Sequence, residues 1–136
     1  MYSSDYKVRV RYADTDQMGF VYYGNYPIFY EIGRVEAMRN LGFSYKKLED
    51  SGIMMPVLES SSKFLLPAKY DELIKIRTTI TSLPKVKIHF NYEIYNEIDK
   101  LIHTGETILA FIKKDTMRPC RVPSEIIDLL NPYFNT

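Results

Sequence analysis

The chain has 136 residues, enough for one domain with a real hydrophobic core and too few for two. Its 18 Lys and Arg residues nearly balance its 17 Asp and Glu residues, so the charge gives no reason to expect binding to nucleic acid. We therefore expect a single domain over residues 1–136, in which any anionic ligand is met by local basic residues.

Cysteine usage and hydropathy narrow the possibilities further. The single Cys120 excludes an internal disulfide, and the sequence contains no Cys and His cluster that would bind a metal. The N-terminus lacks a basic region followed by an apolar run, and no apolar stretch approaches the length of about 20 residues that a membrane helix needs. These features predict a soluble, cytoplasmic protein with no metal site and no insertion into a membrane.

The first element expected is a strand over residues 6–12. Val8, Val10 and Tyr12 alternate with basic residues, and a period of two is typical of a half-buried strand.

A helix is expected over residues 26–40. Asn25 precedes it as a suitable N-cap, Pro27 is tolerated in a first helical turn, and Gly42 is a suitable stop. Apolar residues lie around most of this helix, which indicates that it is well buried and favours a sheet that wraps around it.

The rest of the chain alternates mainly as strands. The expected elements are a short helix over 44–50, a strand over 56–66, a turn over 67–72, strands over 73–83 and 86–94, a hairpin loop over 96–100, a strand over 101–114 and a short helix near 126–130. Gly105 is a possible bulge in the last strand. A mainly antiparallel sheet of five strands curling around one long helix is an α+β fold.

The acidic turn between the first strand and the long helix is the best place for chemistry. Asp14 and Asp16 lie two residues apart, and Gly19 permits a sharp turn before the helix. A carboxylate can act as a base or a nucleophile, and the amides of a helix N-terminus can stabilise developing negative charge.

Two other interpretations of this turn compete with the catalytic one. A calcium-binding loop would need an oxygen ligand at the position of Met18 and a bidentate Glu at the position of Asn25. Neither residue fits, so calcium is disfavoured. A purely structural turn, in which Asp side chains bind nearby amides, is common for such a short motif.

The neighbouring residues carry a family resemblance. The run Asp14-Thr-Asp16-x-x-Gly19-x-Val21-Tyr22-x-x-x-Tyr26, followed by Phe29-Tyr-Glu-x-x-Arg34, resembles the acyl-CoA thioesterases of the hotdog fold. It is most similar to the 4-hydroxybenzoyl-CoA thioesterase branch and its relatives near the bacterial Tol-Pal genes. Further matches follow in the expected order, at residues 67–72 and 121–123.

The resemblance implies catalytic roles for a small set of residues. It makes Asp16 the catalytic carboxylate, either a nucleophile or a general base. It also implies that the backbone N–H of Tyr23 polarises the thioester carbonyl, and that Gly19 forms the turn. Glu31 is an alternative carboxylate, because another hotdog branch uses a helix Glu; it is equally a helix acid favoured by the dipole.

The resemblance also suggests how substrate is bound. Tyr26 either lines the acyl pocket or packs against the sheet. Lys85 and Lys87 align with the family's basic loop that meets coenzyme A phosphates, although they also fit a solvated strand face. Arg118 and Arg121 are weaker candidates of the same kind.

The implied function is hydrolysis of a short-chain or aromatic acyl-CoA, with no cofactor beyond the coenzyme A of the substrate. Alternatives are an acyl-carrier-protein thioesterase and a non-catalytic acyl-CoA-binding domain. A hotdog dehydratase would pair a His with the carboxylate, but His89 and His103 lie outside the acidic motif and are expected to be satisfied or exposed strand residues. The family further implies a dimer or tetramer with sites at the subunit interface, where the polar run 59–62 would face either a partner's ligand or solvent.

Overall fold

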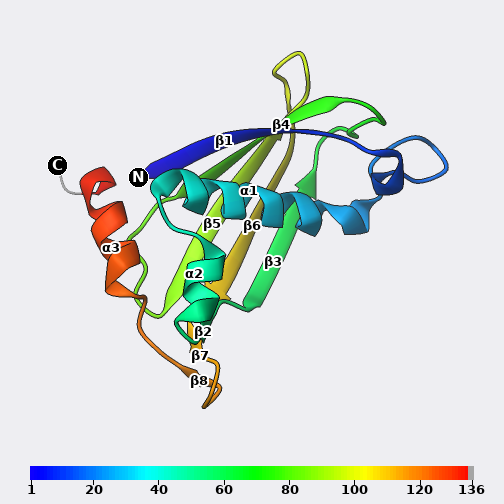
Figure 1. Ribbon diagram of the computed structural model, residues 1–136. Helices are drawn as coiled ribbons and strands as arrows, with labels where there is room; N and C mark the ends of the chain where they lie inside the picture. The colour runs from blue at the N-terminus through cyan, green and yellow to red at the C-terminus, as the bar shows by residue number, and fades with distance from the viewer. Residues whose placement is uncertain (135–136) are drawn as a thin grey trace.

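In the computed structural model, which describes residues 1–134, a five-stranded antiparallel sheet curls around one long helix (Figure 1). The strands are β1 (Tyr2–Arg9), β3 (Val57–Phe64), β4 (Leu73–Ile80), β5 (Lys87–Tyr95) and β6 (Leu101–Ala110). They are arranged in the order β1-β4-β5-β6-β3. The expected α+β class and five-stranded sheet are confirmed.

The core lies between this sheet and the helix α1 (Tyr26–Leu41). Residues of β4 and β5 alternate strictly between buried and more exposed positions, as their sequence predicts. Each large side chain buried in this way contributes about 1.5–3 kcal/mol. The inward-facing residues of the two strands are Ile74, Ile76, Thr78, Ile80, Ile88, Phe90, Tyr92 and Ile94.

The helix begins at Tyr26 and stops at Gly42, both as expected, but its N-terminal cap differs. Gly42 has a φ of 106°, and its N–H donates to the carbonyls of Met38 and Arg39, which is a left-handed C-terminal cap. Asn25, expected as the N-cap, makes no capping bond with its side chain. Its side-chain amide donates instead to the Asp14 carbonyl at 2.9 Å, and a 3-10 turn, η2 (Tyr23–Asn25), precedes α1.

The first strand is displaced from its expected position. It spans Tyr2–Arg9 and pairs with the whole of β4, from Tyr2 opposite Ile80 to Arg9 opposite Leu73. Tyr12, expected to be in this strand, is 81% exposed and begins the 3-10 turn η1 (Tyr12–Asp14). Pairing with a strand some seventy residues away sets these boundaries, so local alternation alone placed them wrongly.

The predicted strand over 101–114 is two strands. After β6, β7 (Ile112–Lys113) joins β2 (Ile53–Met54) and β8 (Arg118–Pro119) in a small second sheet.

Gly105 is not a bulge. The register with both neighbouring strands runs through it without a shift. A Cβ at this position would lie 2.1 Å from the Tyr30 hydroxyl oxygen, so the absence of a side chain makes room for a residue of α1.

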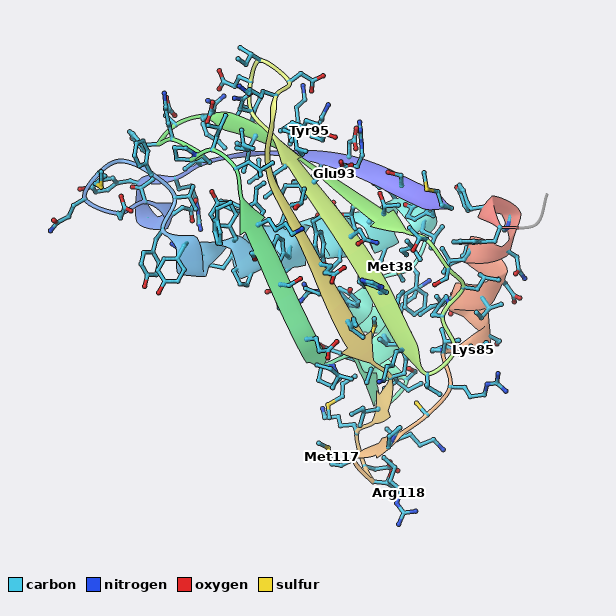
Figure 2. The ribbon with its side chains drawn as sticks, turned by 180° about the vertical axis from the view of Figure 1, so that it is seen from behind. Met38, Lys85, Glu93, Tyr95, Met117 and Arg118 are labelled. Carbon is cyan, nitrogen blue, oxygen red and sulfur yellow. The ribbon has the colours of Figure 1, made fainter. Side chains whose placement is uncertain are left out.

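Two short helices complete the fold. In α2 (Tyr45–Asp50), the Ser44 hydroxyl accepts a bond from the Lys47 N–H, which confirms the predicted cap. The helix α3 (Ser124–Leu130) follows the second sheet and leads into η3 (Asn131–Tyr133). Seen from behind, the second face of the main sheet is covered by none of the helices that the structure describes (Figure 2). Within residues 1–134, no helix is both long and apolar enough to cross a membrane.

Candidate active site

The acidic turn folds as a tight hairpin between β1 and η2. Thr15 and Val21 form an antiparallel bridge. The Asp16 N–H donates to the Phe20 carbonyl at 2.8 Å, and the Gly19 N–H donates to the Asp16 carbonyl at 3.1 Å. Gly19 has a φ of 79°, and nothing lies within 4 Å of where its Cβ would be. Backbone conformation, and not space, is therefore what favours glycine in this turn.

Asp14 is the structural acid of the hairpin. It is only 3% exposed. Its carboxylate accepts bonds from the Arg11 N–H at 2.8 Å and from the Arg11 guanidinium at 3.0 Å. Its carbonyl accepts bonds from the Tyr22 N–H and the Asn25 side chain. Asp14 thereby ties the end of the strand to the start of the helix.

Asp16 is held in place but remains accessible. Its side chain is exposed, and one carboxylate oxygen accepts bonds from the N–H groups of Met18 at 2.9 Å and Phe20 at 3.4 Å. Within residues 1–134, no side chain or amide binds its second oxygen. Both acids lie in a structural turn, and of the two only Asp16 presents a carboxylate outward.

A cavity of about 390 Å³ lies beside Asp16. Two exposed tyrosines, Tyr12 and Tyr70, form one of its walls, and their rings meet edge to face with centroids 5.8 Å apart. The Tyr70 N–H donates to the Gly19 carbonyl at 2.9 Å, which fixes this wall to the hairpin. The lining residues are Tyr12, Thr15, Asp16, Gln17, Gly19 and Tyr70.

Tyr23 begins the helical segment that follows the hairpin. It is the first residue of η2, which continues directly into α1. In the part of the chain that the structure describes, no hydrogen-bond acceptor meets its N–H. A free amide at a helix start is a site where negative charge is stabilised.

Tyr26 and Glu31 lie elsewhere on α1. Tyr26 is 2% exposed and stacks on His103, with ring centroids 4.0 Å apart, so it packs against the sheet, which is one of the two roles expected for it. Glu31 is exposed and lines a separate cavity between α1 and α2.

A buried polar chain behind Tyr26 was missed by sequence reasoning. The Tyr30 hydroxyl hydrogen-bonds both with His103 Nε2 and, at 2.6 Å, with Ser62 Oγ. His103 is fully buried, and burial lowers its pKa to about 4, so its ring is neutral at pH 7. Within residues 1–134, its Nδ1 has no hydrogen-bond partner, so the expectation of a satisfied histidine holds for Nε2 only. His89 is partly exposed and bonds to Glu106 at 3.1 Å.

The predicted coenzyme A-binding residues lie at the far end of the sheet. Lys85 and Lys87 are exposed at the start of β5, and the Lys85 carbonyl accepts a bond from the N–H of Val122, next to Arg121. The structure therefore brings Arg121 close to the two lysines. Figure 2 shows Lys85 near one end of β5 and Tyr95 near the other.

The acidic hairpin belongs to the Tyr95 end. Phe20 of the hairpin forms a bridge with Lys69, which lies just before β4 in the chain. Lys75, near the start of β4, pairs with Tyr95. At 3.3 Å per residue, Lys87 and Tyr95 are about 26 Å apart along β5. Lys85 and Lys87 consequently lie at the end of β5 away from the acidic hairpin of the same chain.

Comparison with known proteins identifies the family. Residues 10–130 match the Thioesterase-like superfamily. The chain belongs to this superfamily.

Individual thioesterase-like proteins agree with this assignment. The acyl-CoA thioester hydrolase YbgC of Escherichia coli is 32% identical over 120 residues, which cover 88% of this chain and 90% of that protein. A DHNA-CoA thioesterase from Staphylococcus aureus is 35% identical, with a TM-score of 0.90 over 98% of this chain and 89% of that chain. A 4-hydroxybenzoyl-CoA thioesterase solved with 4-hydroxybenzoyl-CoA is 20% identical, with a TM-score of 0.84 over 95% and 99% of the two chains. It shares the fold. The expected hotdog architecture and the thioesterase family are both confirmed, and the link to relatives near the Tol-Pal genes stays a prediction.

Among the described residues of this thioesterase-like domain, no group of three or more His, Cys, Asp or Glu side chains is arranged to hold a metal ion. Of the predicted catalytic residues, Asp16 and Gly19 lie on one hairpin, and the Tyr23 amide lies at the helix start that follows it.

Proposed function

We propose that this thioesterase-like protein hydrolyses an acyl-CoA to a free acid and coenzyme A, with Asp16 as the catalytic carboxylate. The observation that carries the proposal is the exposed Asp16 side chain, fixed by two backbone amides in the hairpin that leads to the unpaired N–H of Tyr23. The acyl-CoA hydrolase activity in the name of the YbgC relative supports the same reaction.

The geometry suits attack on a thioester carbonyl. In one route, Asp16 takes a proton from water while the water oxygen bonds to the acyl carbon. In the other, the Asp16 carboxylate attacks first and forms a mixed anhydride, which water then hydrolyses. In both, the carbonyl oxygen becomes negative beside the Tyr23 N–H, the C–S bond breaks, and the thiolate leaves as coenzyme A and is protonated. A preorganised donor of this kind contributes about 3–4 kcal/mol to transition-state stabilisation.

The acyl group is a short-chain or aromatic one in this proposal. Tyr12 and Tyr70 form a wall beside Asp16, and their rings offer a flat apolar surface that suits a short-chain or an aromatic acyl group. Two similar thioesterases are named for aromatic acyl-CoAs, which favours trying those first.

A second copy of the chain completes the site in this proposal. Lys85, Lys87 and Arg121 lie at the end of β5 away from the acidic hairpin, so in this proposal they bind the phosphates of coenzyme A from a partner subunit while the thioester lies at Asp16. The edge strand β3 supports such pairing, because no strand of residues 1–134 lies along its outer side and nearly all its residues are exposed. An unpaired edge of eight residues is a template for another strand.

The test is thiol release from a panel of short, long and aromatic acyl-CoAs. We expect turnover by the wild type and a loss of about 10²- to 10⁴-fold in kcat for Asp16→Asn, because an amide of the same shape neither accepts a proton nor attacks. Asp128→Asn is the matched control, since Asp128 is an exposed acid on α3 far from the hairpin in sequence; it should leave kcat unchanged.

Turnover that survives Asp16→Asn would reject the role of Asp16, and Glu31→Gln would be the next variant. If no acyl-CoA is hydrolysed, the same acyl groups are tested on acyl carrier protein. Hydrolysis there would indicate an acyl-carrier-protein thioesterase, and binding without hydrolysis of either substrate would indicate a non-catalytic binding domain.

A further inference from the structure

The side chain of Asn25 makes a different bond from the one that its place before α1 predicts. An N-cap residue has extended backbone angles, and its side-chain oxygen accepts a bond from an amide of the first helical turn. Asn25 has a φ of −93° and a ψ of −8°, and its side chain makes no capping bond. Its Nδ2 donates instead to the Asp14 carbonyl at 2.9 Å, across 11 residues of chain. The side chain therefore serves something other than the cap.

The Asp14 carbonyl is the point at which the acidic hairpin meets the start of the helix. It accepts the side-chain amide of Asn25 at 2.9 Å and the N–H of Tyr22 at 3.0 Å. Asp16 lies two residues after this carbonyl, and the Tyr23 N–H follows Tyr22 directly. One oxygen, with both lone pairs in use, therefore joins the segment that carries the proposed carboxylate to the segment that carries the proposed oxyanion donor.

Asn25 also closes the turn that presents the Tyr23 amide. Its backbone N–H donates to the Tyr22 carbonyl at 2.9 Å, within η2. The residue is half-buried, so water competes less for its bond to Asp14 than it would at a fully exposed position. Within residues 1–134, no other side chain donates to the Asp14 carbonyl. Asn25 thus shapes the turn with its backbone and attaches that turn to the hairpin with its side chain.

The acceptor of this bond is itself held in place. Asp14 is buried, and its carboxylate accepts bonds from the backbone N–H of Arg11 at 2.8 Å and from the guanidinium of the same residue at 3.0 Å. The Asp14 peptide group is therefore a fixed point. The position of the helix start relative to the hairpin depends on the bonds that reach this point from Tyr22 and Asn25.

We propose that Asn25 is a positioning residue, whose side-chain amide sets the distance between the Asp16 carboxylate and the Tyr23 N–H. Attack on a thioester requires the carboxylate and the oxyanion donor to meet one carbonyl group together, and a displacement of about 1 Å can cost on the order of 10²-fold in rate. The catalytic part of this inference rests on the proposed function; the link between hairpin and helix start does not.

The variant Asn25→Ser separates positioning from capping. Serine caps helices about as well as asparagine does, but its shorter side chain does not reach the Asp14 carbonyl from the same backbone position. We expect a loss of about tenfold or more in kcat for an acyl-CoA that the wild type hydrolyses, with KM changed by less than about twofold. Capping predicts a different result, in which Asn25→Ser keeps the wild-type kcat and only Asn25→Ala loses it.

Asn40→Ser is the matched control. The Nδ2 of Asn40 donates to the Ser4 hydroxyl at 2.9 Å near the other end of α1, so this change removes an amide donor from the same helix without touching the hairpin. It should leave kcat unchanged. Asn25→Asp keeps the shape and the capping preference of asparagine but has no N–H to donate, so it remains informative if Asn25→Ser does not fold. It should lose kcat as Asn25→Ser does.

A double variant distinguishes positioning from a general weakening of the fold. The placement of Asp16 matters only while its carboxylate is present, so Asn25→Ser added to Asp16→Asn should lower kcat by less than about twofold further. A weakened fold would multiply the two losses. Multiplied losses, or a wild-type kcat in Asn25→Ser, would overturn the proposal.

Hydrogen exchange tests the link without any measurement of activity. The Tyr22 N–H shares the Asp14 carbonyl with Asn25, so we expect it to exchange about tenfold faster or more in Asn25→Ser. The Phe43 N–H, which donates to the Met38 carbonyl at the far end of α1, should exchange at the wild-type rate. If the wild type hydrolyses no acyl-CoA, faster exchange at Tyr22 would uphold the link and reject only its catalytic use. Unchanged exchange at Tyr22 would overturn both.

Discussion

At the scale of single residues, two acids two positions apart take opposite roles because their surroundings differ. Asp14 is enclosed by the backbone and side chain of Arg11, whereas Asp16 is exposed and bound only by amides of its own turn. The buried acid stabilises the hairpin, and in the proposed function that stability keeps the exposed acid in one position for chemistry.

Also at this scale, His103 should make stability depend on pH. Its pKa is about 4 in the folded protein because of burial, against about 6.5 when unfolded. The unfolded chain therefore binds a proton first as pH falls, so the contribution is complete above pH 6.5 and is lost between pH 6.5 and 4. The difference amounts to roughly 3 kcal/mol.

Urea denaturation of wild type and His103→Gln at pH 7, 6, 5 and 4 tests this prediction. The glutamine amide can still reach the Tyr30 hydroxyl but does not titrate. We expect the wild type to lose roughly 3 kcal/mol more than the variant across the interval; parallel curves would contradict the assignment.

At the scale of elements, α1 lies very close to the sheet at one point. A Cβ on Gly33 would approach the Thr78 Oγ1 to 2.6 Å and the Ile76 Cγ2 to 2.8 Å. Both are short, branched side chains of β4, which cannot turn away. Helix propensity and packing therefore act in opposite directions at this glycine.

The variant Gly33→Ala decides which effect is larger. Alanine improves helix propensity by about 1 kcal/mol, whereas forcing a methyl into a filled space costs typically 1–3 kcal/mol. We expect a net loss of about 1 kcal/mol in the free energy of unfolding, measured in urea, and a larger loss for Gly33→Val. An alanine variant more stable than the wild type would show that the helix can move off the sheet.

At the scale of the whole molecule, the chain separates its proposed catalytic and phosphate-binding groups. Asp16 lies at one end of the sheet, and Lys85 and Lys87 lie at the other. Along the same sheet, β3 leaves an unpaired edge with exposed apolar residues such as Leu58. Both features are explained if two copies pair edge to edge.

Activity should therefore depend on association. We expect Leu58→Glu, which places a charge on the β3 edge, to be monomeric by light scattering and to lose most of its thioesterase activity. Ile98→Glu changes an equally apolar residue, 81% exposed in the β5–β6 loop, and should change neither property. Dilution of the wild type should lower activity per chain as the oligomer dissociates. A fully active monomer would contradict the proposal that two subunits share each active site.

The sequence by itself determined whatever depends on near neighbours. The alternation of β4 and β5 and the stop at Gly42 could be predicted because period and backbone preference act over a few residues. The acidic turn was recognised for the same reason, since its residues are contiguous.

Only the tertiary structure decided what depends on residues far apart in the chain. The boundaries of β1 follow from pairing with β4, Gly105 is small because Tyr30 reaches it, and His103 is buried beneath Tyr26. Side-chain packing and burial are set by contacts that close long loops, and a local pattern carries no record of which distant residue fills the space.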